Sequence, residues 1–212
     1  MTAPAGNWVQ KASDSFVRAN ENPLSGGGNW SGQGRFCYLT SNTVFGTVNG
    51  ASNVSVWTAR TWLPDQYATV WAPTYSGGNL QGPALRCTGG GANDGYYFRF
   101  RRGPGANNST TDLLYKTGID SGGSISYSFT QANVNSLVSG YITVYIKGWD
   151  FTAVDEVTGL VFCTATDSGQ RFATGSPGVH VYTAFGTPGV IGPWTGGEDI
   201  GRVRYPIVSF KG

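Results

Sequence analysis

The chain has 212 residues, of which 12% are charged and 14% aromatic, and its net charge at pH 7 is +2. So small a net charge argues against binding to nucleic acid or to an anionic membrane, and no apolar run approaches the length of a membrane-spanning helix. The low charged fraction and the 33 glycines predict an all-β fold of many short strands joined by turns. Because no break in composition divides the sequence, we expect one domain over residues 1–212.

The predicted elements follow one another at the spacing of a sandwich or barrel. A polar arm is expected over residues 1–12, and loop insertions are expected over 149–158 and 186–201. The strands are predicted within residues 35–48, 54–62, 66–72, 82–87, 96–101, 112–117, 124–129, 141–147, 159–166, 178–185 and 202–210.

Three predicted strands alternate between apolar and polar side chains, as half-buried strands do. In residues 96–101 the outward set includes Tyr97 and Arg99, which suit a wet surface that can also bind a ligand. Residues 141–147 direct Tyr145 outward, and residues 179–182 direct His180 and Tyr182 away from the core. We therefore predict a ligand-binding sheet face formed by these five side chains. Sugar binding requires flat aromatic faces, and two tryptophans of predicted loops, Trp149 and Trp194, are further candidates.

Cysteine and acidic residues bear on the redox state and on metals. Cys37, Cys87 and Cys163 are odd in number and lack CxxC spacing, which argues against zinc and allows at most one disulfide. Cys87 and Cys163 are predicted to be buried thiols. No cofactor is expected, although calcium could be bound by acidic residues of predicted loops. These weak candidates are Asp65, Asp94, Asp150 and Asp155.

The order of several segments resembles a known family. DSFVRANENPLSGGGNW, LPDQYATVW, GPALRCTGGGANDGYYFRFRR, YITVYIKG and ATDSGQRFATGSPGVHVYT follow one another, and a final strand ends in SF. Together they resemble the concanavalin A-like lectin/glucanase jelly rolls of the laminin-G type, which occur in bacterial and bacteriophage surface proteins. The resemblance implies two antiparallel sheets, one of them concave, with ligands on the concave face or its rim loops. The insertions predicted over 149–158 and 186–201 depart from it, and fold alone does not give function.

The sequence contains few combinations of residues that could form a catalytic site. A retaining glucanase needs two carboxylates about 5 to 5.5 Å apart, and the motif of that branch, Glu-x-Asp-x-Glu or Glu-x-Asp-x-x-Glu on one strand, is absent. His180 is the only histidine, so any histidine-dependent mechanism must pass through it. A polysaccharide lyase using Tyr97, Arg99, His180 and Tyr182 is one alternative, but such enzymes carry a denser set of polar residues on adjacent strands.

The prediction is therefore a non-enzymatic, lectin-like surface module. Its expected setting is a bacteriophage particle, as a capsid decoration or tail-associated structural and adhesive protein, with cell-surface glycans, other virion proteins or further copies of itself as partners. The alternatives are a carbohydrate-binding module of a secreted bacterial protein and the lyase. Met1 is followed by Thr-Ala-Pro and by no apolar leader, so we expect synthesis in the cytoplasm and a place on the virion surface; a secreted product would have had its leader removed.

Overall fold

The computed structural model describes residues 3–31, 37–47, 52–71, 80–88, 94–101, 110–116, 125–132, 140–182 and 191–201. These residues form short strands and one 3-10 turn, η1 (Gly26–Gly28). The strands are β1 (Trp8–Asp14), β2 (Trp30–Ser31), β3 (Cys37–Thr40), β4 (Thr43–Gly46), β5 (Ser52–Trp57), β6 (Gln66–Trp71), β7 (Leu80–Cys87), β8 (Gly95–Arg101), β9 (Thr110–Lys116), β10 (Ile125–Ala132), β11 (Tyr141–Lys147), β12 (Asp150–Asp155), β13 (Val161–Thr166), β14 (Ser176–Tyr182) and β15 (Trp194–Asp199).

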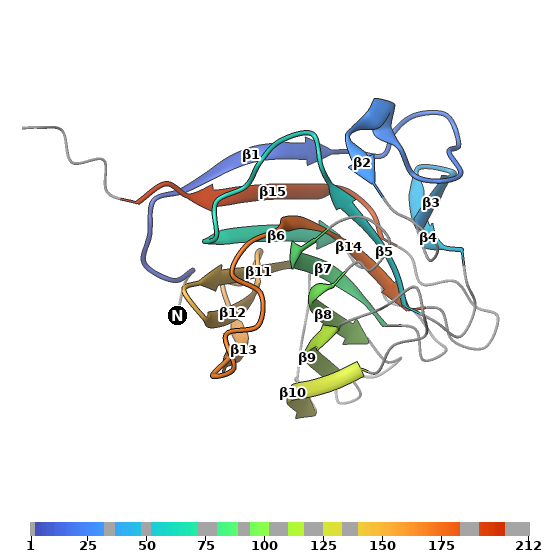
Figure 1. Cartoon of the computed structure of the whole chain (residues 1–212). Coiled ribbons are helices and arrows are strands. Elements are labelled where there is room, and N and C mark those ends of the chain that lie inside the picture. Colours follow the sequence, from blue (N-terminus) through green and yellow to red (C-terminus); the bar gives the residue numbers. More distant parts are fainter. Residues whose placement is uncertain are drawn as a thin grey trace, which may run out of the picture.

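The strands form two large antiparallel sheets and a small hairpin. The six-stranded sheet has the order β1-β15-β6-β11-β12-β13, the seven-stranded sheet has the order β10-β9-β8-β7-β14-β5-β2, and β3 pairs with β4. Figure 1 shows β1, β15 and β6 side by side in the first sheet and β7, β8 and β9 side by side in the second. The all-β, sandwich-like architecture predicted from the sequence is confirmed. No helix within the described ranges has the length and hydropathy needed to cross a membrane.

Alternate residues of both sheets meet in a shared apolar core. The six-stranded sheet contributes Ala68, Val70, Ile142, Val144, Ile146 and Phe151, and the seven-stranded sheet contributes Tyr96, Phe98, Val179 and Val181. Fully burying a side chain of the size of valine or phenylalanine stabilises a fold by about 1.5–3 kcal/mol. In β8, β11 and β14 these core residues alternate with the side chains that were predicted to point outward, so the predicted directions of the three strands are confirmed.

Three tryptophans close one part of this core. The rings of Trp57 and Trp194 stack with centroids 5.2 Å apart, and Trp30 packs edge-on against both of them. Trp194 was expected in a loop, but it begins β15 and has no exposed surface. Its large apolar ring is better accommodated between the sheets than in water.

Three further boundaries predicted from the sequence were wrong. Residues 150–155, expected in a loop insertion, form β12, which pairs with both β11 and β13. β1 begins at Trp8, inside the predicted arm, because its backbone pairs with β15. β15 itself lies inside the insertion predicted over 186–201. Residues 183–190 and the final strand predicted over 202–210 lie outside the described residues.

A β-bulge in β7 changes which way its last residue faces. Pairing with β14 shifts register between Ser176 and Gly178, and on the β7 side Arg86 adopts a positive φ of 47°. An extra residue in one strand reverses the alternation beyond it. Cys87 therefore clusters with Ala84 rather than with Leu85, although strict alternation along an unbroken strand would place Cys87 and Leu85 on the same face.

The bulge also directs the Arg86 side chain into the protein, where it is 1% exposed. Its guanidinium donates hydrogen bonds to the carbonyl oxygens of Pro64, Phe172 and Gly148 at 2.8, 3.1 and 2.6 Å, and it lies over the Trp149 ring. Burial lowers the pKa of Arg86. Because three segments far apart in the sequence supply the acceptors, this contact joins the loops at one end of the two sheets.

All three cysteines are free and buried, which confirms the prediction of buried thiols at Cys87 and Cys163. Burial raises the pKa of Cys37 and of Cys87 to about 12. Both side chains therefore remain neutral thiols at physiological pH.

Candidate functional site

The outward face of the seven-stranded sheet carries three of the five predicted face residues. Tyr97 and His180 lie on β8 and β14 with ring centroids 5.1 Å apart, and Arg99 follows two residues after Tyr97 on the same face. All three side chains are buried, with exposed fractions of 0%, 0% and 4%. The structure brings these three of the five predicted residues to one face, but a ligand at the surface would not contact them because all three are buried.

The other two predicted face residues have different positions. Tyr182 is the last residue of β14, and only its backbone is described. Tyr145 belongs to β11 of the six-stranded sheet, so it does not share a face with Tyr97 and His180. The alternation that placed it outward was correct, but alternation does not show which sheet a strand joins.

Tyr145 is one of three aromatic rings that pack together on the outward face of the six-stranded sheet. The Trp8 ring lies 5.0 Å from Tyr145 and 6.1 Å from Tyr67, and the two tyrosine rings are 5.4 Å apart. Trp8 and Tyr67 are half-buried and Tyr145 is 9% exposed. We call Trp8, Tyr67 and Tyr145 the aromatic platform.

A glycine in β15 makes room for the platform. A Cβ on Gly197 would lie 2.2 Å from the Tyr67 ring and 2.5 Å from the Val9 carbonyl oxygen. Since the second contact is with backbone, a larger residue could not be accommodated by a side-chain movement alone. The Tyr67 ring therefore lies close over the backbone of β15, between β6 and β1.

The platform hydroxyls stay protonated at neutral pH. Burial, together with the negative charge of Glu156, raises the pKa of both Tyr67 and Tyr145. A neutral phenol can both donate and accept a hydrogen bond. Next to the platform, the hydroxyls of Thr69 and Thr143 are hydrogen-bonded to each other at 2.6 Å.

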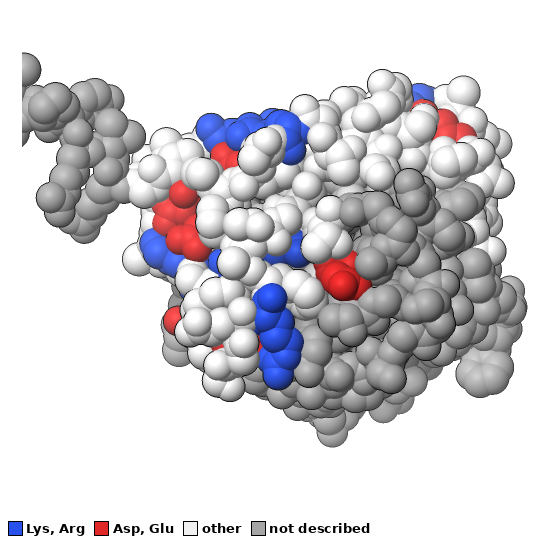
Figure 2. Space-filling view, in the orientation of Figure 1, with Lys and Arg blue, Asp and Glu red and all other residues white. Residues whose placement is uncertain are grey.

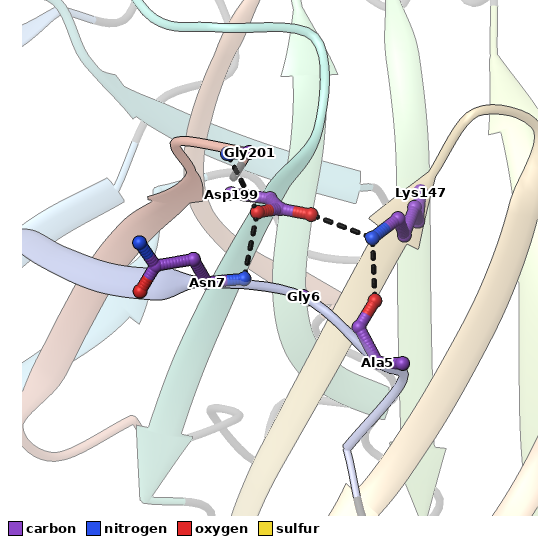
Figure 3. A pocket seen from close by; sticks show the side chains of 6 residues that line it. All are labelled: Ala5, Gly6, Asn7, Lys147, Asp199 and Gly201. Carbon is purple, nitrogen blue, oxygen red and sulfur yellow. Dashed lines mark hydrogen bonds and ion pairs between the residues drawn. The ribbon is translucent and has the colours of Figure 1, made fainter. Parts of the chain in front are cut away.

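A cavity of about 380 Å³ opens beside the platform. Its walls come from the N-terminal segment, the end of β11 and the end of β15, and Figure 3 shows the Lys147 and Asp199 side chains pointing toward each other there. The lining residues are Ala5, Gly6, Asn7, Lys147, Asp199 and Gly201. This volume falls within the range of small-molecule sites.

Lys147 and Asp199 form an ion pair at the centre of this wall. Lys147 Nζ donates to Asp199 Oδ2 at 2.7 Å and to the Ala5 carbonyl oxygen. Asp199 Oδ1 accepts the backbone N–H groups of Asn7 at 2.8 Å and Gly201 at 2.9 Å. Burial would raise the pKa of Asp199, but the hydrogen bonds from Lys147 and these N–H groups outweigh it and lower the pKa. The carboxylate is therefore ionised at neutral pH.

Backbone carbonyl oxygens of the N-terminal segment accept hydrogen bonds that hold this segment against the six-stranded sheet. Trp8 Nε1 donates to the Pro4 carbonyl oxygen at 2.7 Å, and Ile200 donates its N–H to the Asn7 carbonyl oxygen. A Cβ on Gly6 would come within 2.6 Å of Asp199 Oδ2, so this close approach requires glycine. The Asn7 side chain points away from the Asp199 carboxylate (Figure 3) and is exposed.

The acidic residues considered for calcium do not gather into a group of three or more in the described part of the chain. Asp65 accepts the Gly148 N–H at 2.8 Å, and Asp150 accepts the Thr166 hydroxyl at the start of β12. Asp155, at the other end of β12, accepts two N–H groups of its own turn. Asp94 precedes β8 and accepts the Thr88 N–H with its carbonyl oxygen. The described residues include no group of three or more histidine, cysteine or acidic side chains placed to hold a metal ion.

Sequence reasoning missed most of the residues around this site. The alternation of residues 66–71, with Ala68 and Val70 inward, carried the signal for Tyr67. Trp8 lay in the predicted arm, and Asp199 lay in a predicted loop. The remaining tryptophan candidate, Trp149, sits in the turn between β11 and β12 as the partner of Arg86.

Comparison with models of known protein families finds no match, and comparison with curated protein sequences also finds none. The functional interpretation therefore rests on the site itself.

Proposed function

We propose that this protein is a non-catalytic, lectin-like module that binds carbohydrate on the outward face of its six-stranded sheet. The observation that carries the proposal is the aromatic platform of Trp8, Tyr67 and Tyr145, together with the polar cavity beside it. Each alone is a common feature. Their adjacency gives one surface that offers both an apolar face and charged hydrogen-bonding groups.

Carbohydrates match this combination chemically. One face of a pyranose ring is lined by C–H groups that pack against an aromatic ring, whose surface is apolar and electron-rich. The hydroxyls around the edge of the sugar need donors and acceptors, which Lys147 and the exposed Asn7 amide supply. Trp8 lies between the two, since its ring contacts the tyrosines and Lys147 Nζ lies 6.0 Å from its centroid.

The seven-stranded sheet gives the lyase alternative no comparable support. Its candidate side chains Tyr97, Arg99 and His180 are buried, and an acid or base must come within hydrogen-bonding reach of the substrate. We propose a binding role without turnover for this reason. The finer fold assignment, a concanavalin A-like jelly roll, and the setting on a virion or in a secreted product remain part of the proposal.

A glycan-array screen of the purified protein tests the function. The unaltered protein, Trp8→Ala and Tyr67→Ala are applied with calcium and again with a chelator. We expect saturable binding of a defined group of glycans by the unaltered protein and at least a tenfold loss in each variant. Binding should be unchanged by the chelator.

A matched control separates the platform from aromatic surface in general. Tyr141 lies on β11, on the same face as Tyr145 but at the other end of the strand, and it is 40% exposed. Tyr141→Ala should bind as the unaltered protein does. Absence of any glycan bound by the folded protein would overturn the proposed function, and equal losses in Tyr141→Ala and Tyr67→Ala would remove the platform from it.

A further inference from the structure

The charges around the cavity bear on which sugars it can accept. Lys147 is the cation of the lining, and its charge is compensated by Asp199 at 2.7 Å. One more carboxylate lies close to it, because Asp150 is the cross-strand partner of Lys147. Figure 2 shows acidic and basic surface side by side where β15 ends. The cavity therefore presents no uncompensated positive charge.

The hydrogen-bonding groups that remain are suited to hydroxyls. An ammonium group has three N–H donors, and two of those of Lys147 go to Asp199 and to the Ala5 carbonyl oxygen. The third can donate to a ligand, and the side chain is 41% exposed. Asp199, whose side chain is 4% exposed, holds Lys147 in place and neutralises it.

We propose that the cavity selects neutral, hydroxyl-rich sugars and rejects their carboxylated counterparts, with Asp199 as the residue that sets this preference. The inference rests on the proposed carbohydrate-binding function and names the ligand class of that same site. A sugar carboxylate at Lys147 would lie near the Asp199 carboxylate, and like charges at close range in a partly buried site repel strongly. A hydroxyl at the same place accepts the remaining Lys147 N–H without that repulsion.

The test compares sugars that differ only at C6. Titration calorimetry measures the dissociation constants of methyl glucoside against methyl glucuronide, and of methyl galactoside against methyl galacturonide. We expect the unaltered protein to bind the neutral member of at least one pair about tenfold or more tightly than its acidic counterpart. Tighter or equal binding of the acidic members in both pairs would overturn the inference, as would preferential binding of glucosamine over the neutral sugars.

Variants then assign the preference to Asp199. Asp199→Asn removes the compensating charge, so its preference for the neutral sugar should shrink at least tenfold or reverse. Asp94→Asn removes a carboxylate that precedes β8 of the other sheet and should leave the preference unchanged. A preference that is the same in Asp199→Asn as in the unaltered protein would overturn the role of Asp199.

Asp199→Asn could fail to fold, because the carboxylate accepts three hydrogen bonds. A second measurement on the unaltered protein covers that case. Electrostatic rejection weakens as salt screens the charges, so the neutral-to-acidic ratio should fall as ionic strength rises, and a constant ratio would contradict the inference. Failure of all sugars and glycans to bind would instead refute the proposed function, whereas binding with an acidic preference would refute only this inference.

Discussion

The two outward sheet faces carry similar residue types but differ in exposure. On the seven-stranded sheet, Tyr97 and His180 lie against each other with no exposed surface. On the six-stranded sheet, Trp8 and Tyr67 are half-buried beside an open polar cavity. An aromatic residue on an outward face can therefore serve packing in one sheet and remain available for a ligand in the other. Burial, rather than residue type, distinguishes the two.

The largest effect on stability should come from the buried face. Tyr97→Ala removes a fully buried aromatic side chain, which typically costs about 3–5 kcal/mol, and urea unfolding would measure the loss. Tyr67→Ala, on the half-buried platform, should cost clearly less, because part of that ring already contacts solvent. Equal losses in the two variants would break the contrast between the faces.

A substitution beneath the platform should affect both stability and binding. Gly197→Ala places a Cβ against the Tyr67 ring and the Val9 carbonyl oxygen, and overpacking of this kind costs about 1–3 kcal/mol. Thr195→Ala, on the same face of β15, is the matched control and should be nearly neutral. Thermal unfolding and glycan titration of both variants check this, and a fully stable Gly197→Ala would contradict the close approach described here.

The stability that Asp199 contributes on the six-stranded face should fall at low pH. The pKa of Asp199 is lowered by folding, so its contribution is present above the ordinary aspartate pKa of 3.8 and is lost as the pH falls through the lower folded value. Asp199→Asn should thus be less stable than the unaltered protein by about 1–2 kcal/mol at neutral pH, and the two should converge below pH 3.8. Urea unfolding over a pH series measures the difference. By contrast, the difference in stability between Tyr97→Ala and the unaltered protein should persist at low pH, because this substitution removes no carboxylate.

The prediction with the smallest expected effect concerns how accessible the buried cysteine thiols are to solvent. Cys87 belongs to the same buried cluster as Tyr97, and burial raises its pKa to about 12. We expect none of the three native thiols to react with a thiol reagent until the protein unfolds. Thr164→Cys, at an exposed position of β13, should react at once. Rapid reaction of Cys87 in the folded protein would show that the seven-stranded face is open.

Sequence patterns predicted the directions of side chains better than their surroundings. The alternation in YITVYIK correctly placed Ile142 and Tyr145 on opposite faces, because a strand has a fixed period of two. It could not show that β11 joins β6 and β12 in one sheet while β8 and β14 join the other. Nor could it show the bulge at Arg86, since a positive φ at an arginine leaves no mark in the pattern.

The site was harder to predict than the fold because long-range contacts create it. Asp199 is 192 residues away in sequence from Asn7 and 52 residues away from Lys147, and it is hydrogen-bonded to both. Their meeting depends on the register of β1 with β15 and on the order β15-β6-β11, and no local pattern encodes either. Trp8 could not be recognised as part of a binding surface while its segment was taken for an unpaired arm.

The central claim is that the six-stranded face binds carbohydrate and the seven-stranded face does not. An NMR titration of the unaltered, isotope-labelled protein with a glycan identified on the array would test it without any substitution. The account predicts that backbone amide shifts change around Trp8, Tyr67, Lys147 and Asp199 and stay constant around Tyr97 and His180. Shift changes confined to β8 and β14 would contradict it.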